Sequence, residues 1–342
     1  RRLIDGMRSR GYREAFARRI FDQIRGFGEY GFPESHSASF ALLVYVSAWL
    51  KCYEPAAFLA ALLNSQPMGF YSASALVQDA RRHGVEVRPV DARASDREST
   101  LEADANGEPA VRLGLGLVKG LSRQGAERLV AARAQGALAG VADLAARAAL
   151  NRRDLEALAA AGALEGLGGH RHRAHWEVAG IEVPLPLLAA DGGPEPEPLL
   201  RRPREGEDIV ADYNSLGLTL RRHPLAVLRR QLASHGWLSA AEVQARAHGE
   251  RVQVAGIVVC RQHPSSATGV VFVTLEDETG NTNVIVWRNL VDRQRRELLQ
   301  ARLLVVSGEV QKEGEVLHVL AQHLLDRSAL LGALVTSSRD FR

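Results

Sequence analysis

The sequence predicts a multidomain α+β protein: a mostly helical part up to about residue 249, followed by a five-stranded β-barrel over residues 250–326. Three observations predict it. Apolar residues recur with helical spacing through most of the chain, glycines interrupt that pattern twice in its middle, and five strand-like runs close together near its end. With 342 residues, 46% of them apolar, the chain can form two or three domains.

Residues 1–27 place apolar side chains at helical spacing opposite arginines, and a turn is expected over residues 28–33. A buried helix is expected over 38–53, and further helices over 56–64 and 72–82, the last ended at Gly84. Residues 85–90 alternate as a strand, and 100–103 with 110–115 form a hairpin around Asn106-Gly107. We assign residues 1–117 to one unit.

Residues 118–180 contain an internal repeat. Val118–Arg133 and Leu155–Trp176 both place a glycine-containing hairpin between helical stretches. Glycine lets backbone N–H groups approach a phosphate oxygen closely, so the pair predicts a tandem helix-hairpin-helix DNA-binding domain. An ordinary helical hairpin stopped by glycines is the alternative. The candidate DNA contacts are Lys119, Gly120, Leu121, Arg123, Gly125 and Arg128 in the first copy, and Arg152, Arg153, Gly162, Gly166, Gly168, Gly169, Arg171 and Arg173 in the second.

The charge distribution favours a polyanionic partner. Residues 1–30 carry eight basic and four acidic residues, residues 118–180 carry nine and six, and residues 181–212 carry three and eight. All but three of the 43 basic residues are arginine, whose forked donors suit phosphate, although a compositional bias toward Arg and Ala would have the same effect. The positive potential is therefore concentrated where DNA would be held.

Residues 181–249 are predicted as an acidic Pro/Gly/Glu-rich linker (184–208) followed by helices that break at His223-Pro224. In residues 250–326 a helix candidate, 289–300, stands between the third and fourth strand-like runs, and the turn Glu278–Asn281 joins the second and third. That order is typical of an OB barrel. Residues 327–342 are predicted as a loosely held tail.

An OB barrel commonly binds single strands on the face of its second and third strands. The candidate contacts are Phe272, Trp287 and Arg288, with Arg261 and Lys312 at the rim. Phe272 and Trp287 could instead fill the interior of the barrel. The barrel segment as a whole carries eight basic and ten acidic residues, which predicts only local binding.

No metal site is predicted, because His172 and His175 lack a third ligand and Glu276–Glu278 look like a solvated turn. The two cysteines lie far apart, no apolar run of 18 residues is present, and no signal peptide precedes the first helix. These features predict a cytoplasmic protein with no membrane span. The sequence opens RRLIDGMRSR without a Met, so we expect the C-terminal piece of a longer protein.

Two adjoining segments resemble one family. YGFPESHSASFALLVYVSAWLKC, Tyr30–Cys52, is similar to the fingers of the bacterial C-family replicative polymerase, the alpha subunit of DNA polymerase III. Ala56–Asp91 resembles its error-prone, damage-tolerant branch, as do Asp212–Leu225 and Ser337–Arg342. The resemblance runs through almost the whole chain, from Arg1 to Arg342. The short stretch ASALVQD departs slightly from the family, and the clamp-binding peptide of the replicative members is absent.

The resemblance implies a DNA-directed DNA polymerase of translesion synthesis and SOS-type repair, of which this chain holds the end of the fingers, the hairpins and the barrel. It places the palm carboxylates and their Mg²⁺ ions upstream, so this piece is expected to bind no cofactor and to be inactive alone. The implied partners are primer-template DNA, deoxynucleoside triphosphates and accessory mutagenesis proteins that contact the sliding clamp indirectly. The incoming nucleotide is expected to bind at the polar helix start formed by Ser35, His36 and Ser37. Lys51 and Arg25 are secondary candidates for the same contact.

Two rival readings use the same modules. One is a non-catalytic DNA-binding or scaffold protein built of hairpins and an OB barrel. The other is an RNA-binding OB module of the synthetase type. Titration with primer-template DNA and with RNA at two salt concentrations would separate the RNA-binding module from the polymerase, because phosphate-dominated binding falls steeply with salt.

Overall fold

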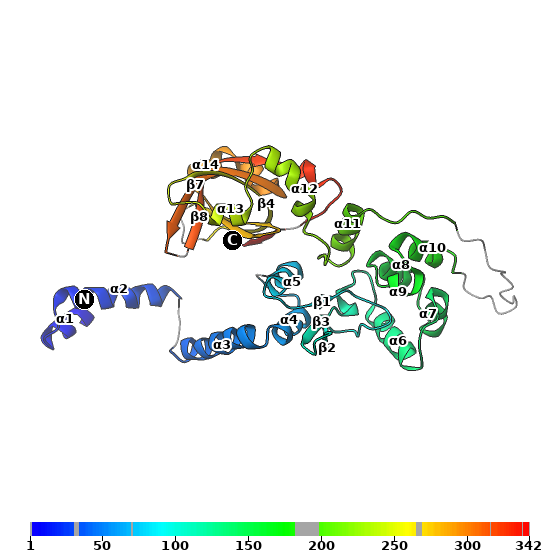
Figure 1. Cartoon of the computed structure of the whole chain (residues 1–342). Coiled ribbons are helices and arrows are strands. Elements are labelled where there is room, and N and C mark those ends of the chain that lie inside the picture. Colours follow the sequence, from blue (N-terminus) through cyan, green and yellow to red (C-terminus); the bar gives the residue numbers. More distant parts are fainter. Residues whose placement is uncertain are drawn as a thin grey trace. The chain divides into compact units, whose positions relative to one another are not determined.

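A computed structural model describes residues 2–30, 34–69, 71–181, 198–264, 269–314, 316–336 and 338–341. The chain forms two compact units, Arg1–Phe58 and Leu59–Arg342, and each is described by itself (Figure 1). The first unit contains α1 (Arg2–Ser9), α2 (Glu14–Tyr30), α3 (Glu34–Tyr53) and the start of α4 (Pro55–Asn64).

The sequence predicted helical spacing throughout residues 1–27, but the structure has two helices there, α1 and α2, with a break between them. Gly11 adopts a φ of 85°, which reverses the chain between α1 and α2. The helix α3 starts earlier than predicted, at Glu34, so Ser35–Ser37 lie in its first turn rather than before it. Its large apolar side chains were predicted to be buried, but Phe40, Leu43 and Tyr45 are exposed within the described chain.

The second unit starts with the rest of α4 and continues with α5 (Ala73–Arg82) and a small sheet. The Ser72 hydroxyl accepts the Ala75 N–H (3.1 Å) to start α5, and Gly84 with a φ of 85° follows its end. The strands β1 (Val87–Arg88), β2 (Thr100–Ala103) and β3 (Pro109–Arg112) form a sheet in the order β1-β3-β2. The predicted hairpin turn is closed by the Asp104 carboxylate, which accepts the N–H groups of Asn106 (2.7 Å) and Glu108 (2.8 Å).

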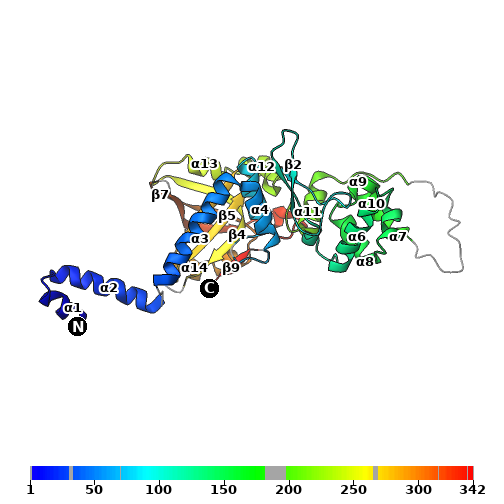
Figure 2. The same cartoon turned by 90° about the horizontal axis from the view of Figure 1, so that it is seen from below.

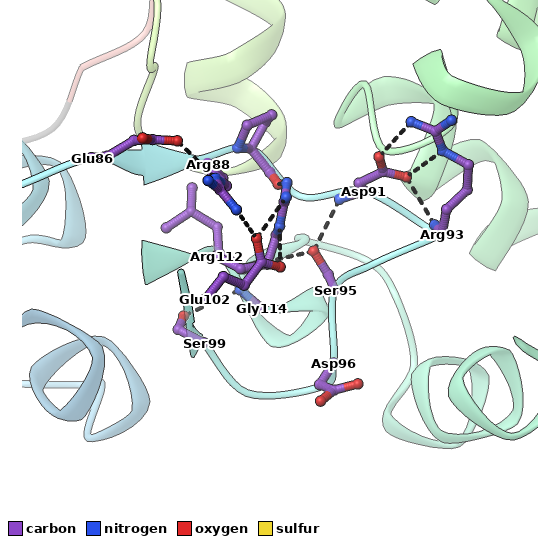
Figure 3. A network of polar contacts seen from close by, with 12 residues as sticks. Glu86, Arg88, Asp91, Arg93, Ser95, Asp96, Ser99, Glu102, Arg112 and Gly114 are labelled. Carbon is purple, nitrogen blue, oxygen red and sulfur yellow. Dashed lines mark hydrogen bonds and ion pairs between the residues drawn. The ribbon is translucent and has the colours of Figure 1, made fainter. Parts of the chain in front are cut away.

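Glu102 joins all three strands of this small sheet (Figure 3). Its carboxylate accepts from Arg112 Nε and Nη2, both at 2.9 Å, and from Arg88 Nη1 at 2.6 Å. Hydrogen bonding to Arg112, opposed by burial and helped by Arg88, lowers the pKa of Glu102 from 4.5 to about 2. A carboxyl group with a depressed pKa in the folded state stabilises the fold above its ordinary pKa and loses that contribution as the pH falls toward 2.

Glu102→Gln should therefore flatten the acid limb of the stability profile. The wild-type chain should lose more of its denaturant midpoint between pH 4.5 and pH 2 than the variant, whereas above pH 5 the variant should be the less stable of the two. The measurement is a series of urea titrations from pH 2 to pH 7. Parallel pH profiles for the two proteins would contradict this assignment.

A group of short helices follows the small sheet in both views (Figures 1 and 2). It contains the 3-10 turn η1 (Leu115–Leu117), α6 (Arg123–Ala134), α7 (Val141–Arg147), α8 (Arg152–Ala160), α9 (Glu165–Gly168) and α10 (Arg171–Ala179). Leu129, Leu144, Leu158 and Leu164 are completely buried in this group. Burying one leucine side chain contributes roughly 1.5–3 kcal/mol, so these residues hold the short helices together.

The stretch predicted as an acidic linker overlaps a helix at its end. Residues 182–197 lie outside the described chain, but α11 (Glu205–Ser215) already begins within the expected linker. The helices α12 (Pro224–Ser234) and α13 (Ala240–Gln244) follow, and the predicted break at His223-Pro224 is confirmed. His223 Nδ1 accepts the Leu225 N–H (3.2 Å), and Pro224 occupies the first helical position, where no N–H is needed.

The predicted five-stranded barrel is confirmed. Its elements are β4 (Arg251–Gln262), β5 (Val271–Asp277), β6 (Gly280–Val286), α14 (Arg288–Arg293), α15 (Arg295–Gln300), β7 (Leu303–Glu313) and β8 (Val316–Asp326). Antiparallel pairing joins β4 to β5 and β7, β5 to β6, and β7 to β8, and parallel pairing of β6 with β8 closes the barrel. The single predicted helix is split at Gln294. Buried valines and leucines from all five strands fill the interior.

The expectation of a loosely held tail is wrong for the described residues. Leu331 and Leu334 are buried, and β9 (Arg339–Phe341) pairs in parallel with β4 beyond the point where β7 stops (Figure 2). The physical reason is an edge of β4 that β7 leaves unpaired after Ile257 and that the tail covers.

Candidate nucleic-acid interface

The first predicted hairpin leads directly into α6. Gly120 has a φ of 90°, a conformation that favours glycine, and the Ser122 hydroxyl accepts the Gly125 N–H at 2.9 Å. The N–H groups of Arg123 and Gln124 lie in the first turn of α6, where no intrahelical acceptor exists, and no described residue accepts from them. The hairpin therefore presents donors and the positive end of a helix dipole to a ligand.

A buried carboxylate ties this hairpin to a second helix start. Asp154, 1% exposed, accepts the Ser122 N–H at 2.8 Å with one oxygen and the Ser122 hydroxyl at 3.0 Å with the other. Asp154 itself lies in the first turn of α8, which Asn151 caps by accepting the Asp154 N–H at 2.8 Å. The N-termini of α6 and α8 consequently lie side by side.

The site depends on Asp154, which sequence reasoning missed. A signal for this residue was present in the sequence. Asn151, a residue type that caps helices, is followed by two arginines and then by the acidic Asp154. The pairing also explains Gly125, because a Cβ there would stand 2.6 Å from Asp154 Oδ2.

Four arginines surround the two helix starts. The side chains of Arg123 and Arg152 are largely exposed and pair along their own helices with Glu127 (2.8 Å) and Glu156 (2.9 Å). Such surface pairs contribute at most about 1 kcal/mol, so a phosphate can replace the carboxylate. Arg128 is 3.8 Å from Asp154, and Arg153 is exposed with no ion pair to any described residue. We call these four arginines, with residues 120–125, the hairpin surface.

Lys119 has a structural contact instead of a free ammonium group. Its Nζ donates to the Tyr213 carbonyl at 3.0 Å, and its backbone N–H donates to the Ser215 carbonyl at 2.8 Å. Both acceptors are in the last turn of α11, where a cation also complements the helix dipole. Lys119 therefore fixes the hairpin against α11.

The second predicted hairpin differs from the first. A Cβ on Gly166 would stand 2.2 Å from the Arg93 guanidinium, and one on Gly168 would stand 2.9 Å from Glu177 Oε2. Side chains of this chain thus fill the space that we expected a phosphate to occupy. Gly162 and Gly169 keep positive φ values of 72° and 76°, which serve the chain reversals.

Two of the four arginines predicted for the second copy, Arg171 and Arg173, pair with carboxylates outside the hairpin surface. Arg171 is 5% exposed, donates to Asp212 Oδ1 at 2.5 Å and also pairs with Asp208. Arg173 donates to Glu177 Oε1 at 3.1 Å on its own helix. A buried, doubly paired guanidinium cannot reach DNA, which corrects the prediction for Arg171.

The outer surface of β5 and β6 carries the barrel's aromatic candidates. Along β5, Val271, Val273 and Leu275 are buried while Phe272 and Thr274 between them are partly exposed. Along β6, the outward row is Asn281, Asn283 and Ile285, and Trp287 continues it with 55% exposure. Phe272 pairs with Ile285, which makes Trp287 its diagonal neighbour. The interior alternative for both aromatic residues is therefore wrong. We call Phe272, Thr274, Asn283, Ile285 and Trp287 the barrel face.

The three basic candidates of the barrel have different surroundings. Arg261 is 6% exposed, donates to the carbonyls of Leu298 and Ala301 and pairs with Ser338 of the tail, so it is a structural residue and not a rim contact. Lys312 is exposed in the β7–β8 hairpin. Arg288 is exposed beside Trp287.

Four of the nucleotide-binding candidates are spread along α3, and the fifth, Arg25, lies in α2. His36 and Ser37 are exposed in its first turn, where His36 packs on Phe40 with ring centroids 4.4 Å apart. Lys51 lies in the last turn, about 22 Å from His36 at the rise of an α-helix, so one compact site cannot hold both. The side chains of Ser35 and Arg25 lie outside the described residues.

Two residues of the acidic run at the β5–β6 turn, Glu276 and Asp277, are buried rather than solvated as we expected, and Glu278 is partly exposed. Asp277 accepts the Ala240 N–H at 2.7 Å and pairs with Arg229, and Glu276 lies 3.5 Å from His223. The described residues contain no group of three potential metal ligands. None of their helices combines the length and the apolar character needed to cross a membrane.

The tandem helical hairpins and the closed barrel define a nucleic-acid-binding protein. A model described as "Helix-hairpin-helix motif" matches residues 84–174, and one described as "OB-fold nucleic acid binding domain" matches residues 252–326. The chain is related throughout to proteins named error-prone DNA polymerase, which confirms the resemblance seen in the sequence.

Three of these relatives show the extent of the similarity. The chain is 57% identical to the error-prone DNA polymerase of Methylococcus capsulatus, over 100% of this chain and 34% of the relative. Identity is 58% with that of Alkalilimnicola ehrlichii (99% and 33%) and 55% with that of Aromatoleum aromaticum (100% and 32%). The chain thus spans about a third of the length of the curated relatives it matches.

Proposed function

We propose that this chain positions DNA for an error-prone DNA polymerase that copies damaged templates in SOS-type repair. The observation that carries the proposal is the hairpin surface: two helix N-termini, joined by the Asp154–Ser122 hydrogen bonds and surrounded by four arginines. Backbone donors and guanidinium groups bind phosphates without reading the base sequence. A polymerase requires this of its DNA-binding surface, because it must hold DNA of any sequence. The hairpin surface would hold duplex, and the barrel face would hold single-stranded template by stacking on Phe272 and Trp287.

The chemical step would take place elsewhere in the polymerase. Primer extension needs two Mg²⁺ ions held by carboxylates, and the described residues contain no suitable group of ligands. We propose that the palm carboxylates of the intact enzyme hold the metals, that this chain alone does not extend primers, and that His36 at the start of α3 contacts the incoming deoxynucleotide. Accessory mutagenesis proteins would provide sliding-clamp contact.

Replacing Arg152 and Arg153 together by Gln should weaken binding to duplex DNA about tenfold at 100 mM salt. Each lost phosphate contact should reduce the slope of log affinity against log salt by about 0.9, so the double variant should lose nearly 2. Fluorescence anisotropy with a labelled primer-template at four salt concentrations measures both quantities.

Arg81→Gln/Arg82→Gln, an adjacent exposed pair at the end of α5, is the matched control with the same change in charge. It should leave the salt slope unchanged. An equal loss in both double variants would show that only net charge matters, and the hairpin surface would then not be the duplex contact.

A further inference from the structure

The positive charge of the barrel is concentrated on the two helices between β6 and β7. Residues 287–302 contain five arginines against Asp292 and Glu297, although the barrel segment as a whole is slightly acidic. Arg302 is used internally, since its guanidinium donates to the Leu334 carbonyl at 2.5 Å. The other four are exposed, and we call them the arginine surface: Arg288, Arg293, Arg295 and Arg296.

The backbone beneath the arginine surface is held firmly. Leu290 and Leu298 are buried in the barrel core. At the break between α14 and α15, the Gln294 side chain donates to the Leu324 carbonyl and accepts the Leu324 N–H, both at 2.8 Å. These three anchors direct the remaining positions of both helices outward, so the arginines are displayed on a fixed support.

Carboxylates of this chain neutralise little of the charge on the arginine surface. Arg288 is 3.9 Å from Asp292, Arg293 donates to the Asn289 carbonyl at 3.2 Å, and Arg296 donates to the Gln300 side chain at 3.4 Å. Within the described residues, Arg293, Arg295 and Arg296 form no ion pair with a carboxylate. Guanidinium groups without a counter-charge on a rigid support favour binding of an anion.

The arginine surface adjoins the barrel face. Trp287 continues the outward row of β6, and Arg288 follows it as the first residue of α14. Arg288 also packs against the β4–β5 loop, because a Cβ on Gly269 would stand 2.9 Å from Arg288 Cδ. An exposed aromatic ring followed by guanidinium groups matches a single strand, which offers bases for stacking and phosphates for pairing. An acidic peptide would match the guanidinium groups but brings no nucleobase to stack on the ring.

We propose that α14 and α15 form a phosphate-binding surface that carries a single nucleic-acid strand onward from the barrel face, past Trp287. The proposal rests on the proposed function and extends its single-strand site beyond the two strands on which OB barrels usually bind. A strand of about five nucleotides would occupy the barrel face alone, and a longer one would reach the arginine surface.

The test uses the whole chain, labelled oligothymidylates of about 5 and about 20 nucleotides, and the variant Arg293→Gln/Arg295→Gln/Arg296→Gln. For the long strand the salt slope should fall by about 2, since each contact with a single strand contributes about 0.7, and affinity at 100 mM salt should fall roughly tenfold. The short strand should bind as it does to the wild type. Arg230→Gln/Arg246→Gln/Arg251→Gln removes the same charge from exposed positions elsewhere and should change neither strand.

Several outcomes would overturn the proposal. An equal loss in both triple variants would show a net-charge effect, and an equal loss for short and long strands would place the arginines at the barrel face. Unchanged oligothymidylate binding with lost oligoglutamate binding would assign the surface to an acidic peptide. Trp287→Ala distinguishes the proposed barrel-face site from its extension to the arginine surface. If Trp287→Ala weakens binding of both strands and the triple variant weakens binding of neither, the barrel face remains supported and the arginine surface is ruled out. If the wild type binds no single strand, both fail.

Discussion

Replacing Arg171 by Met should destabilise the packing of α10 against α11 by about 3–5 kcal/mol, the range measured when one partner of a buried ion pair is removed. Arg171 bridges two carboxylates that are themselves buried, those of Asp208 and Asp212. After the change, Arg221 would be the remaining guanidinium near both, at 3.1 Å from Asp208 and 3.7 Å from Asp212. Two buried carboxylates would then share one half-exposed cation.

Hydrogen exchange of the peptides that cover α10 and α11 is the suitable measurement, because it reports the local opening of these two helices separately from the rest of the chain. Protection there should fall by about two to four orders of magnitude, which corresponds to that free-energy loss, while the barrel keeps its protection. The variant Arg171→Met/Asp208→Asn/Asp212→Asn should recover most of the loss, since no unpaired charge remains. A change below 1 kcal/mol in the single variant would contradict the buried pairing.

Replacing Asp154 by Ala should weaken duplex DNA binding about tenfold and cost about 2–3 kcal/mol of local stability. The change removes two charge-assisted hydrogen bonds and leaves the Ser122 N–H without its acceptor. The hairpin would then lose its fixed position beside the start of α8, and the donors of the two helices would no longer meet one phosphate backbone together. Anisotropy with primer-template DNA and hydrogen exchange of α6 measure the two effects.

Asp143→Ala provides the matched control. Asp143 also lies in the first turn of a helix, where it accepts the Ala139 N–H at 2.9 Å and pairs with Arg147, but it does not contact the hairpin. It should lower stability without changing DNA affinity. If Asp154→Ala destabilises α6 and leaves DNA affinity unaltered, Asp154 is only structural and the hairpin surface is not the DNA contact.

Local signals in the sequence were sufficient for the elements themselves. The alternation along β5 and β6 and the helix placed before β7 predicted a closed barrel, which the pairing of β6 with β8 confirms. Residues 118–125 predicted a hairpin with outward donors, because a glycine with positive φ and a Ser cap act within a few residues.

The sequence could not decide which arginines are free to bind. Arg153 and Arg171 are equivalent in a count of charge, yet one is exposed and the other is buried against carboxylates 37 and 41 residues away. The same holds for glycine, since Gly166 gives room to Arg93 from another segment and not to a ligand. No local pattern indicates such long-range partners.

The sequence by itself determined the order of helices and strands, the hairpin and barrel classes and the relationship to error-prone polymerases, because these depend on short-range periodicity and on similarity along the chain. Tertiary structure alone decided that Asp154 joins two helix starts, that Arg171 and Arg261 are buried, that the tail covers an edge of β4, and that α14 and α15 display exposed arginines. The physical reason is that the availability of a charge depends on what packs against it in three dimensions.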